Sequence, residues 1–370
     1  MIFNTYPLES LTVEQAKELQ FRMIECITHN FTGKEILNRG DLGVALDINM
    51  PHTTKQAEKA ISDFFDVQSA ILVRGAGTGA IRWAMISCLS PADTVLIHDA
   101  PVYPTTDVTI KNMGLKVICA DFNKIEDIKE KVQCNPQING VLIQHTRQKI
   151  DDSYSLQEVI RCIKSERPGL TVIVDDNYAV MKTPKTGVQC GADLSAFSAF
   201  KLLGPEGVGC ITGKKEFIDK IRSMNYSGGG QVQGHEALDA LSGMIYAPVS
   251  LAIQAEVIQE VFEYINSGNI KGVKKAYIAN AQSKVLLVEF YEDIAAKVLV
   301  LAQELGAIPN PVGSESKYEF CPLFYRISGT FRQADPSLEK RMIRINPMRS
   351  GAKTIIRILE QSVSSVMRVR

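Results

Sequence analysis

Lys201 is the first charged residue of the segment SAFSAFKLLGPEGVG, which begins at Ser195. Burial in an apolar segment lowers the pKa of a lysine amine, and a partly neutral amine is the nucleophile that forms a Schiff base with an aldehyde. The glycines that follow leave room for a bound group against the backbone. We therefore interpret Lys201 as a candidate Schiff-base lysine. The simpler alternative is an ordinary lysine on the protein surface.

A glycine-rich turn, RGAGTGA, runs from Arg74 to Ala80 between a strand pattern and a helical pattern. Backbone N–H groups at such a turn approach an anion closely, and the helix dipole favours a phosphate there. Gly77, Thr78 and Gly79 are therefore candidates for binding a phosphate monoester. The G-x-G-x-x-A spacing, with Asp99 after the next strand, also fits a dinucleotide fingerprint. A tight structural turn without a ligand is the third possibility.

Two acids and two tyrosines follow other predicted strands. Asp175 and Asp176 end the apolar run 172–174 and precede Tyr178. Unpaired carboxylates at the end of a buried strand are costly, so they must meet a cation, a metal or water. Asp175 suits a protonated ring nitrogen, and its alternative is a helix N-cap. Tyr103 follows another strand and is placed to lie against a flat ring, unless it is an ordinary core or surface tyrosine.

An arginine stands inside a strand pattern near the C-terminus, in the run MIRINP around Arg344. The planar guanidinium group binds carboxylates through two parallel hydrogen bonds. A substrate carboxylate is therefore a reasonable ligand for Arg344, and an ordinary salt bridge is an equal alternative.

Short β-branched runs alternate with helical stretches through the middle of the chain, which predicts an α/β fold with a mostly parallel sheet covered on both faces. These runs are residues 71–73, 95–97, 117–119, 141–143 and 172–174. Ligands bind such sheets at the carboxyl ends of the strands, where most of these candidate residues stand. A long helical region over residues 235–266 then leads to a smaller α+β region. We predict an N-terminal segment (1–45), a large domain with a seven-stranded type of sheet (46–245) and a small C-terminal domain (246–370).

The composition excludes several classes of function. Lys plus Arg and Asp plus Glu both number 41, so a net charge of zero offers no basic surface for nucleic acid or an anionic membrane. Apolar runs such as residues 298–302 are too short for a membrane span, and the N-terminus lacks the pattern of a signal peptide. The eight cysteines and five histidines show no metal-ligand spacing. We expect a cytoplasmic protein without a metal site, whose cysteines are core residues.

Taken together, these residues resemble the fold-type I enzymes that use pyridoxal 5′-phosphate (PLP), the aminotransferase and Cys/Met-metabolism superfamily. The order and spacing match over roughly residues 70–350, and the run KLLGPEGVG looks like the lysine loop of class V aminotransferases and selenocysteine-synthase-like enzymes. The chain as a whole is similar to a bacterial class V aminotransferase-like branch.

The resemblance implies a role for each candidate residue. It implies that Gly77, Thr78 and Ser198 hold the phosphate. It implies that Tyr103 stacks on the pyridine ring, that Asp175 pairs with the ring nitrogen and that Tyr178 reaches the ring hydroxyl. It also implies that Lys201 forms the Schiff base and that Arg344 binds the substrate carboxylate. Two departures from the family pattern stand out. Ala76 replaces a common phosphate-binding serine, and the run 144–148 lacks the usual Asn-Pro motif, so that Arg147 or Gln148 must substitute or Tyr178 must act alone.

The resemblance also implies an activity and an assembly. We expect a PLP-dependent enzyme that acts on an amino acid, with transamination as the first expectation. A carbon–sulfur or related β/γ-elimination lyase is the alternative reaction, and a catalytically silent binding or regulatory protein is the alternative class. A dinucleotide oxidoreductase would explain the glycine turn and Asp99 but would leave Lys201 without a role. The family implies a homodimer with a shared site, in which the loop 227–230 is a candidate to reach the partner's cofactor.

Overall fold

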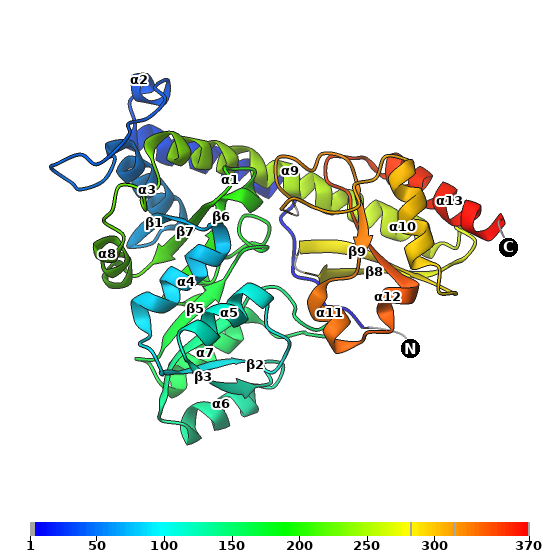
Figure 1. Ribbon diagram of the computed structural model, residues 1–370, viewed down its shortest axis with the longest axis horizontal. Helices are drawn as coiled ribbons and strands as arrows, with labels where there is room; N and C mark the ends of the chain where they lie inside the picture. The colour runs from blue at the N-terminus through cyan, green and yellow to red at the C-terminus, as the bar shows by residue number, and fades with distance from the viewer. Residues whose placement is uncertain (1–3, 282, 314, 369–370) are drawn as a thin grey trace. The chain divides into compact units, whose positions relative to one another are not determined.

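The structure is a computed structural model that describes residues 4–281, 283–313 and 315–368 (Figure 1). The chain forms two compact units. The large unit contains residues 14–145 and 154–248. The small unit contains the described residues before 14, residues 146–153 and the described residues from 249 onward. The segment 146–153 thus leaves the large unit between two of its elements, an excursion that no sequence pattern indicated.

A seven-stranded sheet forms the centre of the large unit. Its strands are β1 (Ser69–Arg74), β2 (Thr94–His98), β3 (Lys116–Ala120), β4 (Ile138–Gln144), β5 (Thr171–Asp175), β6 (Leu194–Ser198) and β7 (Val208–Gly213). They lie in the order β1-β7-β6-β5-β4-β2-β3. β7 is antiparallel to β1 and β6, and the other neighbouring strands are parallel. The predicted α/β fold with a mostly parallel seven-stranded sheet is confirmed.

Helices cover both faces of this sheet. One face carries α4 (Ala76–Cys88), α5 (Pro104–Asn112) and α8 (Lys215–Met224), and the other carries α6 (Ile125–Cys134) and α7 (Leu156–Glu166). Successive strand residues alternate between the two cores: Val95 and Ile97 enter the first, and Leu96 between them enters the second. This alternation is the two-residue period of a strand with both faces buried, which explains the near-continuous apolar runs.

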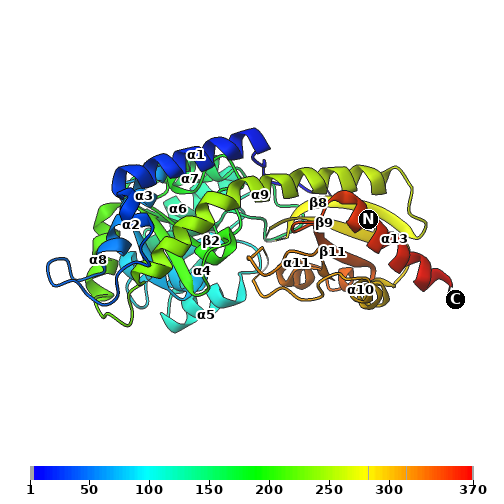
Figure 2. The same cartoon turned by 90° about the horizontal axis from the view of Figure 1, so that it is seen from above.

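The remaining elements of the large unit lie outside this alternation. They are α1 (Val13–Asn30), α2 (Gly33–Ile36), α3 (His52–Phe65) and the short 3₁₀ helices η1 (Val188–Cys190) and η2 (Ala199–Leu202). Helix α9 (Gly234–Asn266) starts in the large unit and continues into the small one (Figure 2). Within the described chain, α9 is the one helix with the length and apolarity of a membrane span. Half of its apolar window is buried inside the protein.

The small unit contains a four-stranded antiparallel sheet in the order β10-β11-β9-β8. Its strands are β8 (Val273–Ala281), β9 (Ser283–Phe290), β10 (Leu323–Arg326) and β11 (Met342–Asn346), and its helices are α10 (Ala295–Glu304), α11 (Gly329–Ala334), α12 (Leu338–Arg341) and α13 (Ala352–Arg368). Residues of α9, α10 and α13 form the core on one face, and residues of α11 and α12 enter the core on the other. The sequence analysis did not anticipate β8, because this edge strand carries two consecutive lysines, three alanines and an asparagine instead of a β-branched run.

Candidate active site

The candidate residues of the large unit lie at the carboxyl ends of its strands. Gly77 and Thr78 follow β1, Asp175 is the last residue of β5, and Ser198 is the last residue of β6. Lys201 lies in η2, directly after β6. The strand order brings these ends to one edge of the sheet, which is where ligands bind in open α/β folds.

The glycine turn after β1 is held in place by the loop that follows Lys201. Gly75 has a φ of +98°, a conformation that glycine adopts without a steric penalty. The backbone N–H groups of Gly75 and Ala76 donate to the carbonyl oxygen of Gly207, at 2.8 Å and 3.0 Å. Gly77 and Thr78 then occupy the first turn of α4, where N–H groups lack partners inside the helix. The turn therefore presents two backbone donors to an anion.

A buried serine next to this turn fits a phosphate oxygen. Ser198 pairs with Gly209 of β7, and a side chain on Gly209 would collide with the carbonyl oxygen of Ala76. The Ser198 Oγ is buried and forms no hydrogen bond with the residues that the structure describes. An unsatisfied buried hydroxyl costs about 1–3 kcal/mol, so an external acceptor would stabilise it. The residues at this edge of the sheet therefore fit the phosphate of PLP.

Lys201 lies beside the tyrosine that the sequence analysis singled out. Its Nζ is 4.7 Å from the centroid of the Tyr178 ring, and the Nζ of Lys182 is 5.3 Å from the same centroid. Cation–π contacts of this kind hold an amine over a ring face. Lys201 is partly exposed, whereas its apolar neighbours in the sequence suggested full burial. The structure thus brings Lys201 and Tyr178 together at the carboxyl end of β6.

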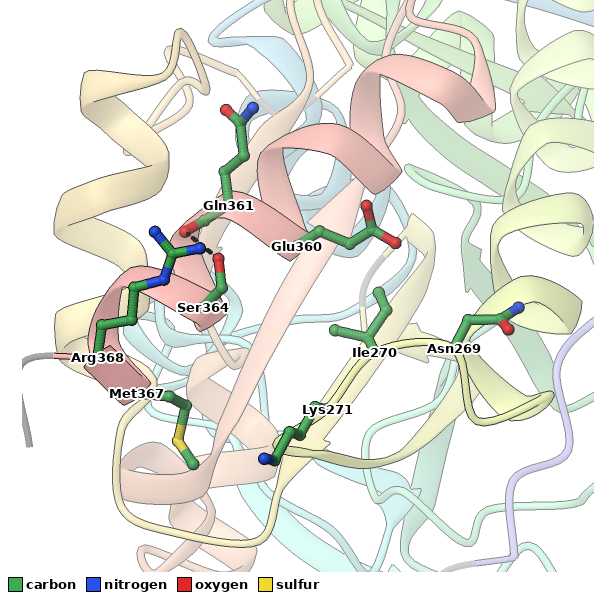
Figure 3. A pocket seen from close by; sticks show the side chains of 8 residues that line it. All are labelled: Asn269, Ile270, Lys271, Glu360, Gln361, Ser364, Met367 and Arg368. Atoms are coloured by element: carbon green, nitrogen blue, oxygen red, sulfur yellow. Dashed lines mark hydrogen bonds between the residues drawn. The ribbon is translucent and has the colours of Figure 1, made fainter.

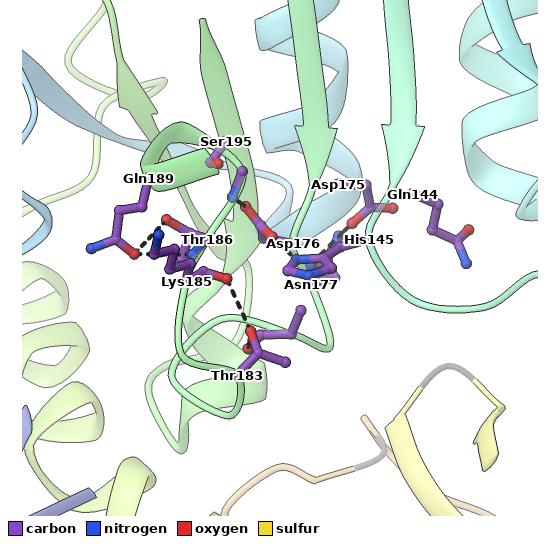
Figure 4. A network of polar contacts seen from close by, with 12 residues as sticks. Gln144, His145, Asp175, Asp176, Asn177, Thr183, Lys185, Thr186, Gln189 and Ser195 are labelled. Atoms are coloured by element: carbon purple, nitrogen blue, oxygen red, sulfur yellow. Dashed lines mark hydrogen bonds and ion pairs between the residues drawn. The ribbon is translucent and has the colours of Figure 1, made fainter. Parts of the chain in front are cut away.

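Asp175 has two hydrogen-bond donors from a single residue (Figure 4). The backbone N and the side-chain Nδ2 of Asn177 donate to Oδ1 of Asp175, at 3.0 Å and 2.8 Å. Burial raises the pKa of Asp175 to about 6, and the neighbouring charge of Asp176 adds to the increase. The two Asn177 donors oppose it, because they favour the ionised carboxylate. A protonated ring nitrogen would further stabilise that anion.

The second acid, Asp176, pairs with a histidine. Asp176 is fully buried, and its Oδ1 lies 2.6 Å from Nδ1 of His145, the residue that follows β4. Its Oδ2 accepts a hydrogen bond from the N–H of Gly187 at 2.9 Å. The two acids therefore have different roles: Asp176 fixes the loops after β4 and β5, and Asp175 is presented at the edge of the sheet.

The run 144–148 is divided between the two units. Arg147 and Gln148 belong to the small unit, where Nε of Arg147 donates to the carbonyl oxygen of Tyr6 at 2.9 Å. Gln144 instead ends β4, and its Cα is paired with that of Asp175 on the adjacent strand. Gln144 is therefore a site candidate that the sequence analysis missed. Its position could have indicated this, because Gln144 directly follows one predicted strand as Asp175 directly follows the next predicted strand.

Tyr103 and His98 follow or end other strands of the large sheet. Tyr103 is the N-cap residue of α5 and is partly exposed, and Thr105 in the first turn of that helix places its Oγ1 3.0 Å from Oγ1 of Thr78. This contact brings the N-terminus of α5 to the glycine turn. His98 is buried and stacks on Phe122, with ring centroids 5.2 Å apart. His98 therefore belongs to the core.

Arg344, the predicted carboxylate ligand, lies in the small unit. It is buried in the middle of β11, and its Cζ is 3.7 Å from the centroid of the Tyr325 ring on β10. The aromatic face holds the guanidinium group in a fixed orientation. A role for Arg344 in substrate binding stays a prediction.

The cysteines depart in part from the expectation of core residues. Cys26, Cys162 and Cys210 are buried, but Cys119 and Cys134 are exposed and the other three are partly exposed. Cys119 is exposed because β3 is an edge strand with an uncovered outer face. Among the described residues no group of three or more His, Cys, Asp or Glu side chains could hold a metal ion.

None of the predicted site residues lines a hollow on the small unit (Figure 3). It has a volume of about 610 Å³ and is lined by residues of α13 and of the turn before β8, among them Lys271, Glu360 and Arg368. Its lining residues include no hydrogen-bond donors from the carboxyl ends of strands and no glycine turn. We therefore place the candidate chemistry at the edge of the large sheet.

Comparison with known proteins identifies the class of protein that this fold and site define. The family model described as aminotransferase class-V matches residues 44–298, and the model of the YhfS-like C-terminal domain matches residues 259–359. The chain belongs to the class-V aminotransferase family of PLP-dependent, fold-type I proteins. The predicted resemblance, fold type and cofactor class are thereby confirmed.

One relative is similar over the whole chain. It is the uncharacterized protein YhfS of Escherichia coli (strain K12), which is 50% identical over 363 residues that cover 98% of this chain and 100% of YhfS. The crystal structure of YhfS, described as a PLP-dependent protein, has a TM-score of 0.95 and covers 98% of this chain and 99% of that chain. A putative cystathionine β-lyase from Listeria monocytogenes shares the fold at 17% identity, with a TM-score of 0.72 over 95% of each chain.

Proposed function

We propose that this chain binds PLP at the carboxyl edge of the large sheet and uses Lys201 to act on an amino acid by transamination. The cofactor assignment is supported most directly by the buried Ser198 Oγ beside the glycine turn, which has no hydrogen-bond partner among the described residues. The match to the class-V aminotransferase model over residues 44–298 supports transamination.

Each proposed role follows from the chemistry of a side chain. Gly77, Thr78 and Ser198 bind the phosphate through backbone and hydroxyl donors. Asp175 holds a proton on the ring nitrogen by accepting its hydrogen bond. When bound, PLP supplies an electron sink for charge that develops at the substrate Cα. The Lys201 amine is the attachment point for the cofactor aldehyde, and once released it moves the Cα proton.

Three further assignments complete the proposal. Tyr103 and Tyr178 contact the ring, as the family resemblance implies. Arg344 binds the substrate carboxylate through its planar guanidinium group.

A lyase is the second candidate, because solved structures of the same fold include the putative cystathionine β-lyase from Listeria monocytogenes and a cystathionine γ-lyase, CalE6, from Micromonospora echinospora. Both likenesses are of fold, at 17% and 16% identity.

An assay of stoichiometry distinguishes transamination from elimination. The holoenzyme is mixed with single amino acids in the absence of a keto-acid acceptor, and keto acid, ammonium and thiol are measured.

Transamination predicts one keto acid per active site without ammonium, and continued turnover when an acceptor keto acid is added. Elimination predicts continued release of keto acid and ammonium without an acceptor, together with thiol from sulfur-containing substrates. Failure of every amino acid to react would contradict both reactions and favour a silent binding or regulatory protein.

A cytoplasmic location also stays a prediction.

We also propose a homodimer whose interface includes two touching loops of the large unit. Leu37, Leu42 and Leu46 lie in one loop and are 87%, 75% and 101% exposed. The side chain of Gln233 links this loop to the glycine-rich loop 227–230 through hydrogen bonds to Gly43 and Gly228. Leucines exposed to this degree in one segment indicate a surface that another protein covers, and a second copy is the proposed occupant.

Substitution of both Leu42 and Leu46 by serine is expected to weaken the dimer by at least about 10²-fold, because burial of each leucine contributes roughly 1.5–3 kcal/mol. Sedimentation of the holoenzyme over a range of concentrations measures this effect. Val300→Ser, an exposed apolar residue of α10, is the control and is expected to leave the mass unchanged. This interface would be excluded if the wild type were monomeric, or if the double variant dimerised as tightly as a dimeric wild type.

A further inference from the structure

Asn177 touches both anchors of the proposed cofactor site. Its backbone N and side-chain Nδ2 donate to the same oxygen of Asp175. On its other side, a Cβ atom added to Gly77 would lie only 2.0 Å from the Asn177 Oδ1. The Asn177 amide therefore fills the space between the carboxylate at the end of β5 and the backbone of the glycine turn after β1.

The residue type suits this position. An asparagine amide has two donor hydrogens and one acceptor oxygen, and donation to a carboxylate fixes which end is which. Aspartate would place a second anion against Asp175, and alanine would leave Asp175 with the backbone donor alone. Because Gly77 has no side chain, the amide oxygen can reach the turn. A larger residue at position 77 would therefore have to displace the Asn177 amide.

Hydrogen bonds to an ionised carboxylate are stronger than those to a neutral one, so Asn177 favours the charged form of Asp175 and one rotamer of it. The opposing influences are burial and the neighbouring charge of Asp176, while His145 beside Asp176 acts in the same direction as Asn177. Loss of Asn177 would therefore change both the position and the charge of the carboxylate.

Resting on the proposed function, we infer that Asn177 is a positioning residue for PLP. It fixes the Asp175 carboxylate against the glycine turn, so that the anchor of the ring nitrogen and the anchor of the phosphate form one rigid unit. Its effect on the cofactor passes through Asp175, and this dependence separates the inference from a general role in folding.

A double-mutant cycle tests the inference without an activity assay. The PLP dissociation constant is measured for full-length wild type, Asn177→Ala, Asp175→Asn and the double variant, with the fluorescence of Trp83 as the signal. Trp83 is the single tryptophan of the chain and lies on α4, the helix that begins at the glycine turn. Melting curves confirm that each variant is folded, and Asn177→Ser is a milder second variant.

A matched control exists in the same sheet. Asn123 donates from its backbone N and its Nδ2 to Oδ1 of Asp121, at 3.1 Å and 2.9 Å, just after the end of β3. Asn123→Ala therefore removes the same kind of contact at a distance from the proposed cofactor residues. It is expected to leave the PLP dissociation constant unchanged.

Asn177→Ala is expected to weaken PLP binding by about tenfold or more, the effect of one hydrogen bond to a charged group. In the Asp175→Asn background the same substitution is expected to change binding by less than about twofold, because the ionised partner is gone. If Asn177→Ala weakened PLP binding equally in both backgrounds, or in neither, the inference would be overturned. The cofactor assignment would still stand in that case, because wild type binds PLP. Absence of PLP binding by wild type would overturn the proposed function and this inference together.

Discussion

Replacement of Lys201 by alanine is expected to abolish the covalent attachment of PLP and to lower kcat/KM by about 10⁴-fold, the upper range for a group that transfers protons. The visible absorbance of the wild-type holoenzyme should be abolished by borohydride, and the variant should lack that lysine-linked absorbance. Mass spectrometry of reduced wild type should then locate the cofactor on the peptide that contains Lys201.

Lys182 provides the matched control, because its amine faces the same Tyr178 ring at a similar distance. Lys182→Ala is expected to retain the absorbance and at least half of the activity. If the modified peptide contained Lys182, or if Lys201→Ala kept its lysine-linked absorbance, the assignment of the attachment residue would be wrong.

Replacement of Asp175 by asparagine is expected to lower turnover by about 10²- to 10³-fold, as for other preorganised electrostatic groups, because the ring nitrogen loses its anionic partner.

The same substitution is expected to stabilise the cofactor-free protein. The pKa of Asp175 rises from 3.8 to about 6 on folding, so ionisation opposes the folded state above that range. The penalty corresponds to about 3 kcal/mol when fully expressed.

The sign of the pH dependence follows from the raised pKa. Below about pH 4 the carboxyl group is protonated in both the folded and the unfolded chain, so Asp175 has no effect on the free energy of unfolding. The penalty grows as the pH rises towards about 6 and is constant above it. Denaturation of the cofactor-free proteins at several pH values should show Asp175→Asn to be the more stable at pH 7.5, with the difference shrinking towards pH 4.5. A difference that is independent of pH would contradict this explanation.

Stability and catalysis are thus expected to change in opposite directions at this position. A buried carboxylate that is costly in the free protein becomes useful when a cationic ring nitrogen pairs with it. The two measurements together test whether Asp175 is kept for the cofactor rather than for folding.

The repeating part of the fold was predictable from local patterns. Five strands of the large sheet, β1 to β5, were located by short apolar runs, because in the central strands burial on both faces demands apolar residues at every position. The glycine turn and the lysine segment were recognisable for a similar reason: a glycine-rich strand-to-helix turn and a lone charge in an apolar segment each impose a local requirement on residue type. β8 was missed, because an edge strand with charged residues lacks such a requirement.

The partners of the polar residues required the tertiary structure. The sequence analysis assigned a role to Asp175 and none to Asp176, and the folded chain shows the partner of Asp176: His145, which comes 31 positions earlier, pairs with it. Gln144 was overlooked and the neighbouring Arg147 was considered in its place, yet the chain leaves the large unit just after His145.

The contact of Asn177 with Gly77 joins residues a hundred positions apart and is likewise invisible in either motif alone. Residue type and spacing report burial and backbone geometry along the chain, whereas hydrogen-bond partners are chosen by strand order and register, which arise when distant segments pack.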